Sequence, residues 1–204
     1  STMGRCVMRL TDITDGKVIF RGEDISKYDH KKMKEIRKHM QMVFQTPSDS
    51  FDPRRTLGDG IGESLRNAGM SKKEARSEVK RLLEACGLPA EFADRYPHQV
   101  SGGQCQRAAI ARALAVKPRL LICDEATSAL DVTVQKEILE LLNELRSQQG
   151  SSLSILFICH DISLVQQFCD RVLVMYHGSI VEEGIPNEVI GSPKNAYTQR
   201  LIDS

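Results

Sequence analysis

Apolar and polar positions follow one another along the chain in blocks that predict strands and helices in alternation. Short runs rich in Ile, Leu and Val predict strands at residues 17–21, 41–44, 120–123, 153–159 and 171–176. Charged or amphipathic segments predict helices at residues 31–39, 132–146 and 162–168. Continuous apolar strands of this kind belong in a mostly parallel sheet covered by helices on both faces. The pattern therefore predicts an α/β fold.

Between residues 57 and 116 the strand signals vanish and helical signals replace them. Ser71 and Glu74 form a capping-box pattern at the start of one helix, and Gly87 stands where its C-terminal cap belongs. The apolar stripe of this helix consists of Ala75, Val79, Leu82, Leu83 and Cys86. We therefore expect a helical subdomain at about residues 46–116, inserted between strands of one domain that covers residues 1–204.

The composition suits one substantial domain, because 204 residues with 41% hydrophobic content can bury a core without disulfide or metal staples. The 28 basic residues nearly balance the 27 acidic ones, so the overall charge does not indicate a nucleic-acid partner. No apolar run approaches the ~20 residues that span a bilayer, and the first residues do not resemble a secretory signal. We expect a soluble chain whose six cysteines, which form no C-x-x-C pair, are reduced thiols and mostly core residues.

Polar side chains follow three of the predicted strands. Gln45 follows residues 41–44, Asp124 and Glu125 follow residues 120–123, and His160 follows residues 153–159. Active sites of open α/β sheets lie at the carboxyl ends of the strands, so we expect these residues to converge. Asp124 can hold Mg²⁺, Glu125 can polarise a water, His160 can donate to a γ-phosphate oxygen, and Gln45 can touch metal and water. For a lone His160, a solvated loop residue would be the better interpretation.

A glycine pair precedes the predicted helix ahead of residue 120. Ser101, Gly102, Gly103 and Gln104 leave backbone N–H groups free to approach an anion. Combined with the strand that ends in Asp124 and Glu125, this order of motifs predicts an ATP-hydrolysing module.

These motifs resemble the nucleotide-binding subunits of ABC transporters across essentially the whole chain. The correspondence is Gln45 with the Q-loop, residues 101–104 with the signature, residues 120–125 with Walker B, Ser128-Ala129-Leu130-Asp131 with the D-loop, and His160 with the switch histidine. The resemblance implies a P-loop NTPase-like sheet with helices on both faces, and a helical subdomain that carries the signature. Residues 50–57 and 195–199 are similar to importers of peptides and related solutes, including nickel. Cys105 stands where the family usually carries a basic residue, and we interpret it as a tolerated surface change.

The phosphate-binding loop G-x-x-x-x-G-K-[ST] does not occur within the 204 residues. Ser1-Thr2, followed by Met3-Gly4-Arg5, resembles the end of that loop running into its helix. The resemblance then implies that the chain lacks the family's first strands, most of the loop and the aromatic residue that stacks on adenine. We expect the chain alone to be inactive.

The resemblance also implies ATP and Mg²⁺ as cofactors. It assigns catalysis to Glu125, His160 and Gln45. It assigns nucleotide contacts to Ser1, Thr2, Gln45, Asp124, Ser101, Gly102, Gly103, Gln104 and Asp131. It assigns the metal to Ser1, Gln45 and Asp124.

The partners implied are a second nucleotide-binding subunit, two transmembrane permease subunits and, indirectly, an extracytoplasmic solute-binding protein, with no nucleic acid. The location implied is peripheral, at the cytoplasmic face of the membrane. Two alternatives stay open. One is a soluble ABC-type ATPase outside transport, which would ordinarily show paired modules or a long heptad insertion. The other is a non-enzymatic remnant that binds partners.

Overall fold

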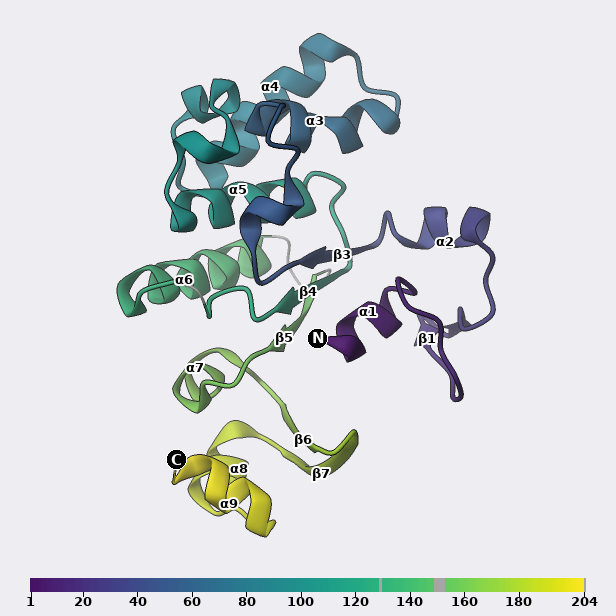
Figure 1. Cartoon of the computed structure of the whole chain (residues 1–204), viewed down its shortest axis with the longest axis vertical. Helices are drawn as coiled ribbons and strands as arrows, with labels where there is room; N and C mark the ends of the chain where they lie inside the picture. The colour runs from purple at the N-terminus through teal and green to yellow at the C-terminus, as the bar shows by residue number, and fades with distance from the viewer. Residues whose placement is uncertain (129, 149–152, 204) are drawn as a thin grey trace. The chain divides into compact units, whose positions relative to one another are not determined.

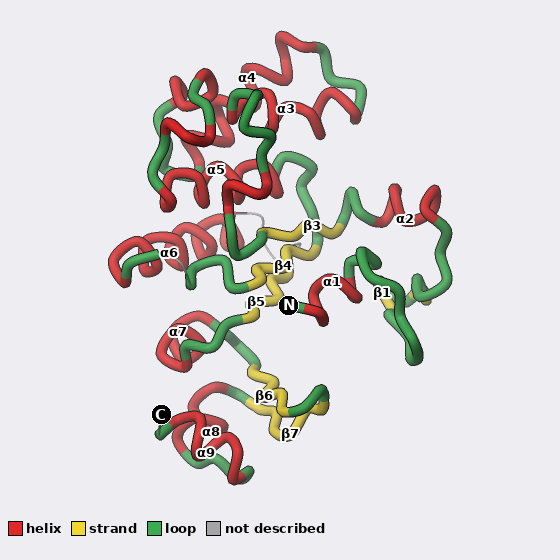
Figure 2. Tube along the Cα trace, viewed as in Figure 1, coloured by secondary structure: helices red, strands yellow, loops and turns green. Residues whose placement is uncertain are grey.

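The structure, a computed structural model, describes residues 1–128, 130–148 and 153–203. The chain divides into two compact units, Ser1–Ile158 and Cys159–Ser204, which are described separately below. Figure 1 labels the elements along the chain, and Figure 2 separates helices from strands by colour.

The first unit carries the elements up to β5. In chain order they are α1 (Thr2–Val7), β1 (Ile19–Phe20), β2 (Glu23–Asp24), α2 (His30–Ile36), β3 (Met40–Val43), the 3₁₀ helix η1 (Pro47–Ser50), α3 (Leu57–Asn67), α4 (Lys72–Ala85), η2 (Ala90–Asp94), η3 (Pro97–Gln99), α5 (Gly102–Leu114), β4 (Leu120–Asp124), α6 (Val132–Gln148) and β5 (Ser154–Ile158).

The second unit carries the remaining elements. They are α7 (Ile162–Phe168), β6 (Val172–Tyr176), β7 (Ser179–Gly184), α8 (Pro186–Gly191) and α9 (Ala196–Ile202).

A three-stranded parallel sheet in the order β3-β4-β5 forms the centre of the first unit. Val43 is in register with Cys123, and Asp124 is in register with Ile158. The three strands therefore end together at one edge, which is the geometry expected from the strand signals of the sequence. The prediction of parallel strands is confirmed for these three.

Helix α1 lies directly on this sheet because of a glycine. Ser1 caps the helix by accepting the N–H of Gly4 on its hydroxyl at 3.3 Å. A Cβ atom added at Gly4 would lie 3.1 Å from Cε of Met42, 3.4 Å from Cγ2 of Ile122 and 3.5 Å from Cδ1 of Ile158. A Cβ atom there would press on the end of the Met42 side chain, so Gly4 permits the close approach that brings Ser1 to the strand ends.

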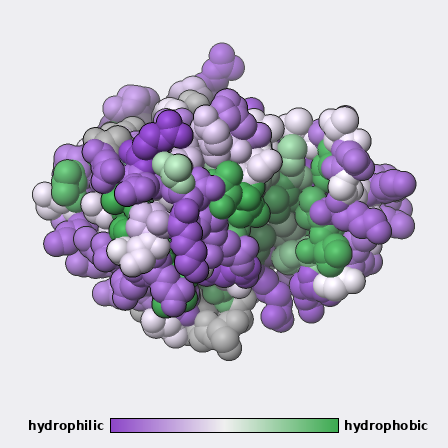
Figure 3. All heavy atoms as spheres, turned by 90° about the horizontal axis from the view of Figure 1, so that it is seen from below, coloured by the Kyte–Doolittle hydropathy of each residue, from purple (hydrophilic) through white to green (hydrophobic). Residues whose placement is uncertain are grey.

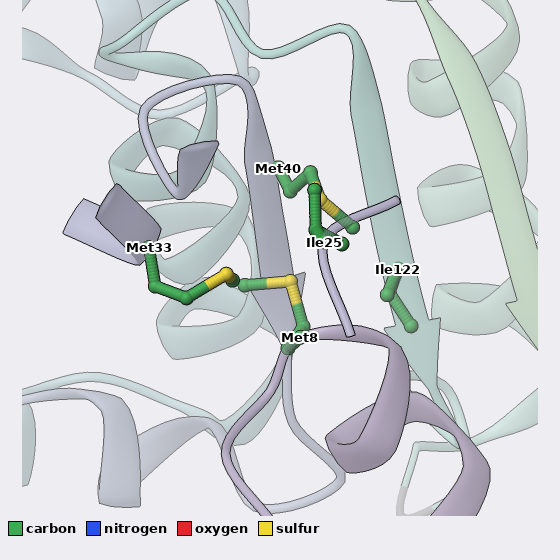
Figure 4. Packing of buried hydrophobic residues seen from close by; sticks show 5 residues of the cluster. All are labelled: Met8, Ile25, Met33, Met40 and Ile122. Carbon is green, nitrogen blue, oxygen red and sulfur yellow. The ribbon is translucent and has the colours of Figure 1, made fainter. Parts of the chain in front are cut away.

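A methionine-rich cluster joins α1, α2 and the sheet. Met8, Ile25, Met33, Met40 and Ile122 are each at most 5% exposed, and Figure 4 shows their side chains converging. Methionine suits this position because its flexible side chain fills irregular gaps between elements. Each fully buried side chain of this size contributes about 1.5–3 kcal/mol. The cluster thus fixes the layer that carries Ser1.

Residues 46–116, all of which the structure describes, contain helices and no strand. The capping box of α4 is present, since Ser71 accepts from the N–H of Glu74 and the Glu74 carboxylate accepts from the N–H of Ser71. Gly87 ends the helix at a φ of +70°, and the N–H of Leu88 donates to the carbonyl of Leu83 at 2.9 Å. The predicted stripe is buried throughout: Ala75, Val79, Leu82, Leu83 and Cys86. The boundaries of a subdomain at 46–116 stay a prediction.

Two antiparallel hairpins accompany the parallel sheet, β1 with β2 and β6 with β7. Both turn through two residues with positive φ, Arg21 (+55°) with Gly22 (+82°), and His177 (+46°) with Gly178 (+81°). Two consecutive positive φ angles give a type I′ turn, whose twist matches that of paired strands. The turns therefore commit both segments to hairpins.

The strand predicted at residues 171–176 is confirmed by β6, but the hairpin corrects the expectation that this strand joins the parallel sheet. Within the described residues, β6 pairs with β7 in a separate two-stranded sheet and not with the parallel strands. The acidic pair Glu182 and Glu183 lies at the end of β7, directly before its last residue, Gly184. The prediction of residues 162–168 as a helix is confirmed by α7.

The segment at residues 195–199 docks α9 onto this hairpin. Asn195 caps α9 by accepting the N–H of Tyr197 at 2.8 Å, and its own N–H donates to the Glu182 carboxylate at 3.1 Å. The ring of Tyr197 lies 4.1 Å from that of Tyr176, measured between centroids. These residues therefore have a folding role inside the second unit.

The surface combines a largely hydrophilic face with local apolar exposure, as Figure 3 shows for one side. Large apolar side chains exposed in the second unit are Leu173, Met175, Tyr176, Ile180 and Ile185. Among the described residues, every helix is too short or too polar to cross a bilayer.

Candidate functional site

Asp124 is the last residue of β4 and is 5% exposed. Its Oδ2 atom lies against the backbone nitrogen of Ser1. Its Oδ1 atom is buried and has no hydrogen-bond partner within the described residues. A buried carboxylate oxygen is costly to leave unpaired, and oxygen is the ligand that Mg²⁺ prefers. Asp124 and the neighbouring Ser1 therefore fit a metal site.

Glu125 adopts a left-handed backbone conformation at a φ of +49°. Its N–H donates to the carbonyl of Ile158 at 2.8 Å, and its own carbonyl accepts from the N–H and Oγ of Ser128 at 3.1 and 3.0 Å. A non-glycine residue in this region costs roughly 1–3 kcal/mol and persists only where surrounding contacts enforce it. These hydrogen bonds turn the chain off the sheet at the residue proposed for water activation.

Gln45 lies two residues beyond the end of β3 and is exposed. Its Nε2 atom donates to Oγ of Ser128 at 3.4 Å. Since Ser128 also donates to the carbonyl of Glu125, one hydroxyl connects the two predicted site residues. The sequence placed Ser128 in the D-loop but did not predict this bridge, which depends on the turn at Glu125.

The segment after Glu125 is held by the first turn of α6. Asp131 accepts the N–H of Val134 at 3.0 Å, as an N-cap does. Nε2 of Gln135 donates to the carbonyls of Thr127 and Leu130 at 2.9 and 3.2 Å. Residue 129 of the predicted D-loop lies outside the described residues. Asp131 therefore has a structural role, and its contact with nucleotide stays a prediction.

The predicted anion site at residues 101–104 begins a helix, as expected. Ser101 and Gln104 form a reciprocal capping box at 3.3 and 2.9 Å. The amides of Ser101 and Gln104 are thus satisfied by side chains, while those of Gly102 and Gly103 belong to the first turn, which lacks intrahelical acceptors. A Cβ atom at Gly103 would lie 2.6 Å from Cγ1 of Val134, so the glycine also permits close packing on α6.

Cys105 is only 4% exposed, which contradicts its interpretation as a surface change. Helix α5 is buried over most of its circumference, because it packs against α3, α4, η1 and β3. Burial raises the pKa of the Cys105 thiol to about 11, so the thiol stays neutral at physiological pH. The residue is a small core side chain.

His160 is the second residue of the second unit and is exposed. The following residue, Asp161, caps α7 by accepting the N–H groups of Ser163 and Leu164 at 2.9 and 3.4 Å. The proximity of His160 to Asp124 and Glu125 stays a prediction. Ser1, Gln45, Asp124 and Glu125 lie within the first unit at the carboxyl edge of the sheet, and Thr2 is the first residue of α1.

Comparison with known proteins identifies the family of the chain. Residues 1–128 match the family described as "ABC transporter". The chain is 45% identical, over 100% of its length, to the oligopeptide transport ATP-binding protein OppF of Bacillus subtilis, of which it spans 67%. It is 43% identical to the protein of the same name from Salmonella typhimurium, of which it spans 61%.

A solved structure shares the fold. The dimeric ATP-binding cassette MJ0796, in a post-hydrolysis state bound to ADP and Pi, superimposes with a TM-score of 0.80 at 30% identity. The match covers 91% of this chain and 79% of that one. The chain therefore belongs to the ABC transporter family, as an ATP-binding cassette, and the resemblance stated from its motifs is confirmed.

Proposed function

We propose that the chain is part of the ATP-hydrolysing subunit of an importer of peptides or related solutes. The observation that carries the proposal is the hydrogen-bonded path from Gln45 through Ser128 to Glu125, beside the buried carboxylate of Asp124. Similarity to proteins named for oligopeptide transport supports the solute class. These relatives are named for oligopeptides and not for nickel, which favours peptides as the solute.

Each residue at the sheet edge would have a distinct role in ATP hydrolysis. Asp124 and the hydroxyl of Ser1 would hold Mg²⁺, with Gln45 nearby, and the ion would neutralise charge developing on the phosphates. Glu125 would orient the attacking water and accept its proton. Gln45 would contact the water and the metal, and its hydrogen bond to Ser128 would connect these contacts to the turn at Glu125. His160 would donate a hydrogen bond to the γ-phosphate.

The remaining predicted contacts come from a second subunit. We infer that Ser101, Gly102, Gly103 and Gln104 of one copy face the phosphates held by another, because helix N-termini favour anions. The dimeric form of MJ0796 supports such an assembly. Two permease subunits and a solute-binding protein would complete the importer, and the chain would then work at the cytoplasmic face of the membrane.

The test compares the 204 residues alone with a loop-bearing chain in which the family's first strands and the residues G-x-x-x-x-G-K precede Ser1, so that Ser1 completes the phosphate-binding loop. We expect magnesium-dependent ATP turnover only from the loop-bearing chain, because the loop supplies the amides and lysine that hold the β- and γ-phosphates. In that chain, Glu125→Gln lowers turnover by about 10²–10⁴-fold while ATP binding survives, since an amide cannot accept the proton.

Glu183→Gln is the matched control, because Glu183 is a partly exposed carboxylate in the separate β6–β7 sheet. Its turnover should equal that of the unmodified chain. Turnover retained by Glu125→Gln would remove Glu125 from the role of base, and absence of turnover in the loop-bearing chain would refute the proposed activity. A normal ATP-induced dimer of Ser101→Arg in sedimentation would contradict the role of the signature across the interface.

A further inference from the structure

Arg112, near the end of α5, reaches across to the segment that follows Gln45. Its Nη1 atom donates to the carbonyl oxygen of Ser50, the last residue of η1. Its guanidinium carbon also lies 5.7 Å from the centre of the Phe51 ring. Burial lowers the pKa of Arg112 while Glu63 opposes that shift, so this side chain is a cation partly withdrawn from water. A cation in this position needs its acceptor and ring, which makes the contact specific.

Phe51 is seated between α5 and α3. It is 7% exposed, and a Cβ atom at Gly60 of α3 would lie only 2.7 Å from its Cδ1 atom. The N–H of Phe51 donates to the carbonyl of Ser48 at 3.0 Å, which completes η1. On the α3 side, Arg55 pairs with Glu63 at 2.8 Å. The segment is therefore held by packing on one helix and by a charged hydrogen bond from the other.

The segment at residues 45–51, named here the arm, is thus fixed at both ends. Gln45 contacts Ser128 at one end, and Ser50 and Phe51 contact Arg112 at the other. Figure 1 shows α5 beside the segment that leaves β3, in agreement with the contacts between α5 and η1. The arm is short, and about half of it is a 3₁₀ turn. A displacement of Ser50 would therefore also displace Gln45.

Helix α5 connects the arm to the predicted signature. Gly102 and Gly103 stand at its first turn and Arg112 about 15 Å further along, at 1.5 Å per residue. A helix of this length moves as a rod, so movement at Gly103 also moves Arg112. Gly103 packs closely on Val134 of α6, so this contact would transmit movement between α6 and the first turn of α5.

We propose that Arg112 is a positioning residue that makes the arm, and with it Gln45, follow the movement of α5. The expected effect on ATP turnover rests on the proposed function. The contact of Arg112 with Ser50 and Phe51, named here the clamp, can be tested without ATP. A ligand that shifts the N-terminus of α5 would then reposition Gln45 beside Ser128 and Glu125 through this one guanidinium.

Hydrogen exchange of the 204-residue chain tests the clamp directly. In Arg112→Gln we expect exchange at the amide of Phe51 to rise roughly tenfold or more, since a charged hydrogen bond to the arm is lost. Protection of α4 should be unchanged. Arg112→Lys keeps the positive charge but lacks the planar guanidinium group, so it should give a smaller rise in exchange at Phe51. Arg76→Gln is the matched control, because it removes an exposed arginine that pairs with Asp94 and not with the arm or with Glu63.

Unchanged exchange at Phe51 in Arg112→Gln would overturn the clamp. So would a uniform rise that includes α4, because it would show general destabilisation. The same variants in the loop-bearing chain test the consequence. We expect kcat to fall roughly tenfold with KM for ATP retained, and Arg112→Lys to recover part of it.

If Arg112→Gln raises exchange at Phe51 but leaves kcat unchanged, the proposal that Arg112 positions Gln45 is overturned. A loop-bearing chain that hydrolyses no ATP would refute the proposed function, and the exchange result on Phe51 would still decide whether Arg112 positions the arm.

Discussion

Gly103 is the position where the first turn of α5 meets the first turn of α6. The Cβ atom of an alanine there would lie 2.6 Å from Cγ1 of Val134, whereas carbon atoms in good contact are about 3.5–4.0 Å apart. Roughly 1 Å of overlap must therefore be relieved. Valine in a helix strongly prefers one rotamer, so Val134 cannot simply rotate away. We predict that Gly103→Ala lowers stability although alanine is the better helix former.

The magnitude follows from two opposed effects. Overpacking of a filled contact costs about 1–3 kcal/mol. Replacing a helical glycine by alanine returns about 0.5–1 kcal/mol. The net result is a destabilisation of about 1 kcal/mol, measured as a lower urea midpoint at an unchanged m value.

Gly102→Ala is the matched control, because its Cβ would lie 3.8 Å from Cδ2 of Leu130, an ordinary contact. This variant should be as stable as the parent or slightly more stable. Val134→Ala combined with Gly103→Ala should recover stability relative to the sum of the single changes, with a coupling of about 0.5–3 kcal/mol. Equal urea midpoints for the alanines at 102 and 103 would refute the close approach of α5 and α6.

Three further predictions concern caps and thiols. Gly87→Ala should cost about 1–2 kcal/mol in urea unfolding, because alanine is strained at a φ of +70°; a variant as stable as the parent would contradict the cap. Hydrogen bonds from the N–H groups of Lys194 and Asn195 hold the pKa of Glu182 below its ordinary value. The stability from this carboxylate is therefore present at neutral pH and lost as pH falls below about 4, so the difference in melting temperature between Glu182→Gln and the parent should shrink on acidification. Cys105 should resist iodoacetamide at pH 8 in the folded chain and react in urea, which mass spectrometry can follow; equal rates would show that it is accessible.

The helices were predictable because their signals lie in their own residues. The box at Ser71 and Glu74, the stripe ending at Cys86 and the glycine after it describe α4 completely, and the structure repeats each of them. The span of α7 was likewise predictable from its apolar run. The parallel order of β3, β4 and β5 followed from strands that are apolar throughout, which need cover on both faces.

The hairpins were not predictable from the same reasoning. β2 consists of two exposed acidic residues, and β7 carries Glu182 and Glu183, so neither shows an apolar strand pattern. Their turns place Arg21 and His177 in left-handed positions where asparagine or aspartate would give the recognisable signal. Pairing between partners, and not local propensity, determines these strands.

For the candidate site, the strand ends predicted Gln45, Asp124 and Glu125 correctly as neighbours of one sheet edge. The bridge through Ser128 was missed, because it depends on the left-handed turn at Glu125, which no spacing reveals. The burial of Cys105 was missed for a related reason. An exposed face is the usual expectation for a helix, and α5 instead packs on several sides at once.

The methionine cluster beneath α1 has a practical consequence. Oxidants convert methionine to a polar sulfoxide, but Met8, Met33 and Met40 are each at most 5% exposed. Peroxide can reach them only when the layer of α1 and α2 opens, so their rate of conversion measures how often it opens. Met175, which is 38% exposed, supplies the reference rate of an accessible thioether in the same sample. Three native methionines, with Met175 as the internal reference, thus act as a label-free reporter of transient opening beside Ser1.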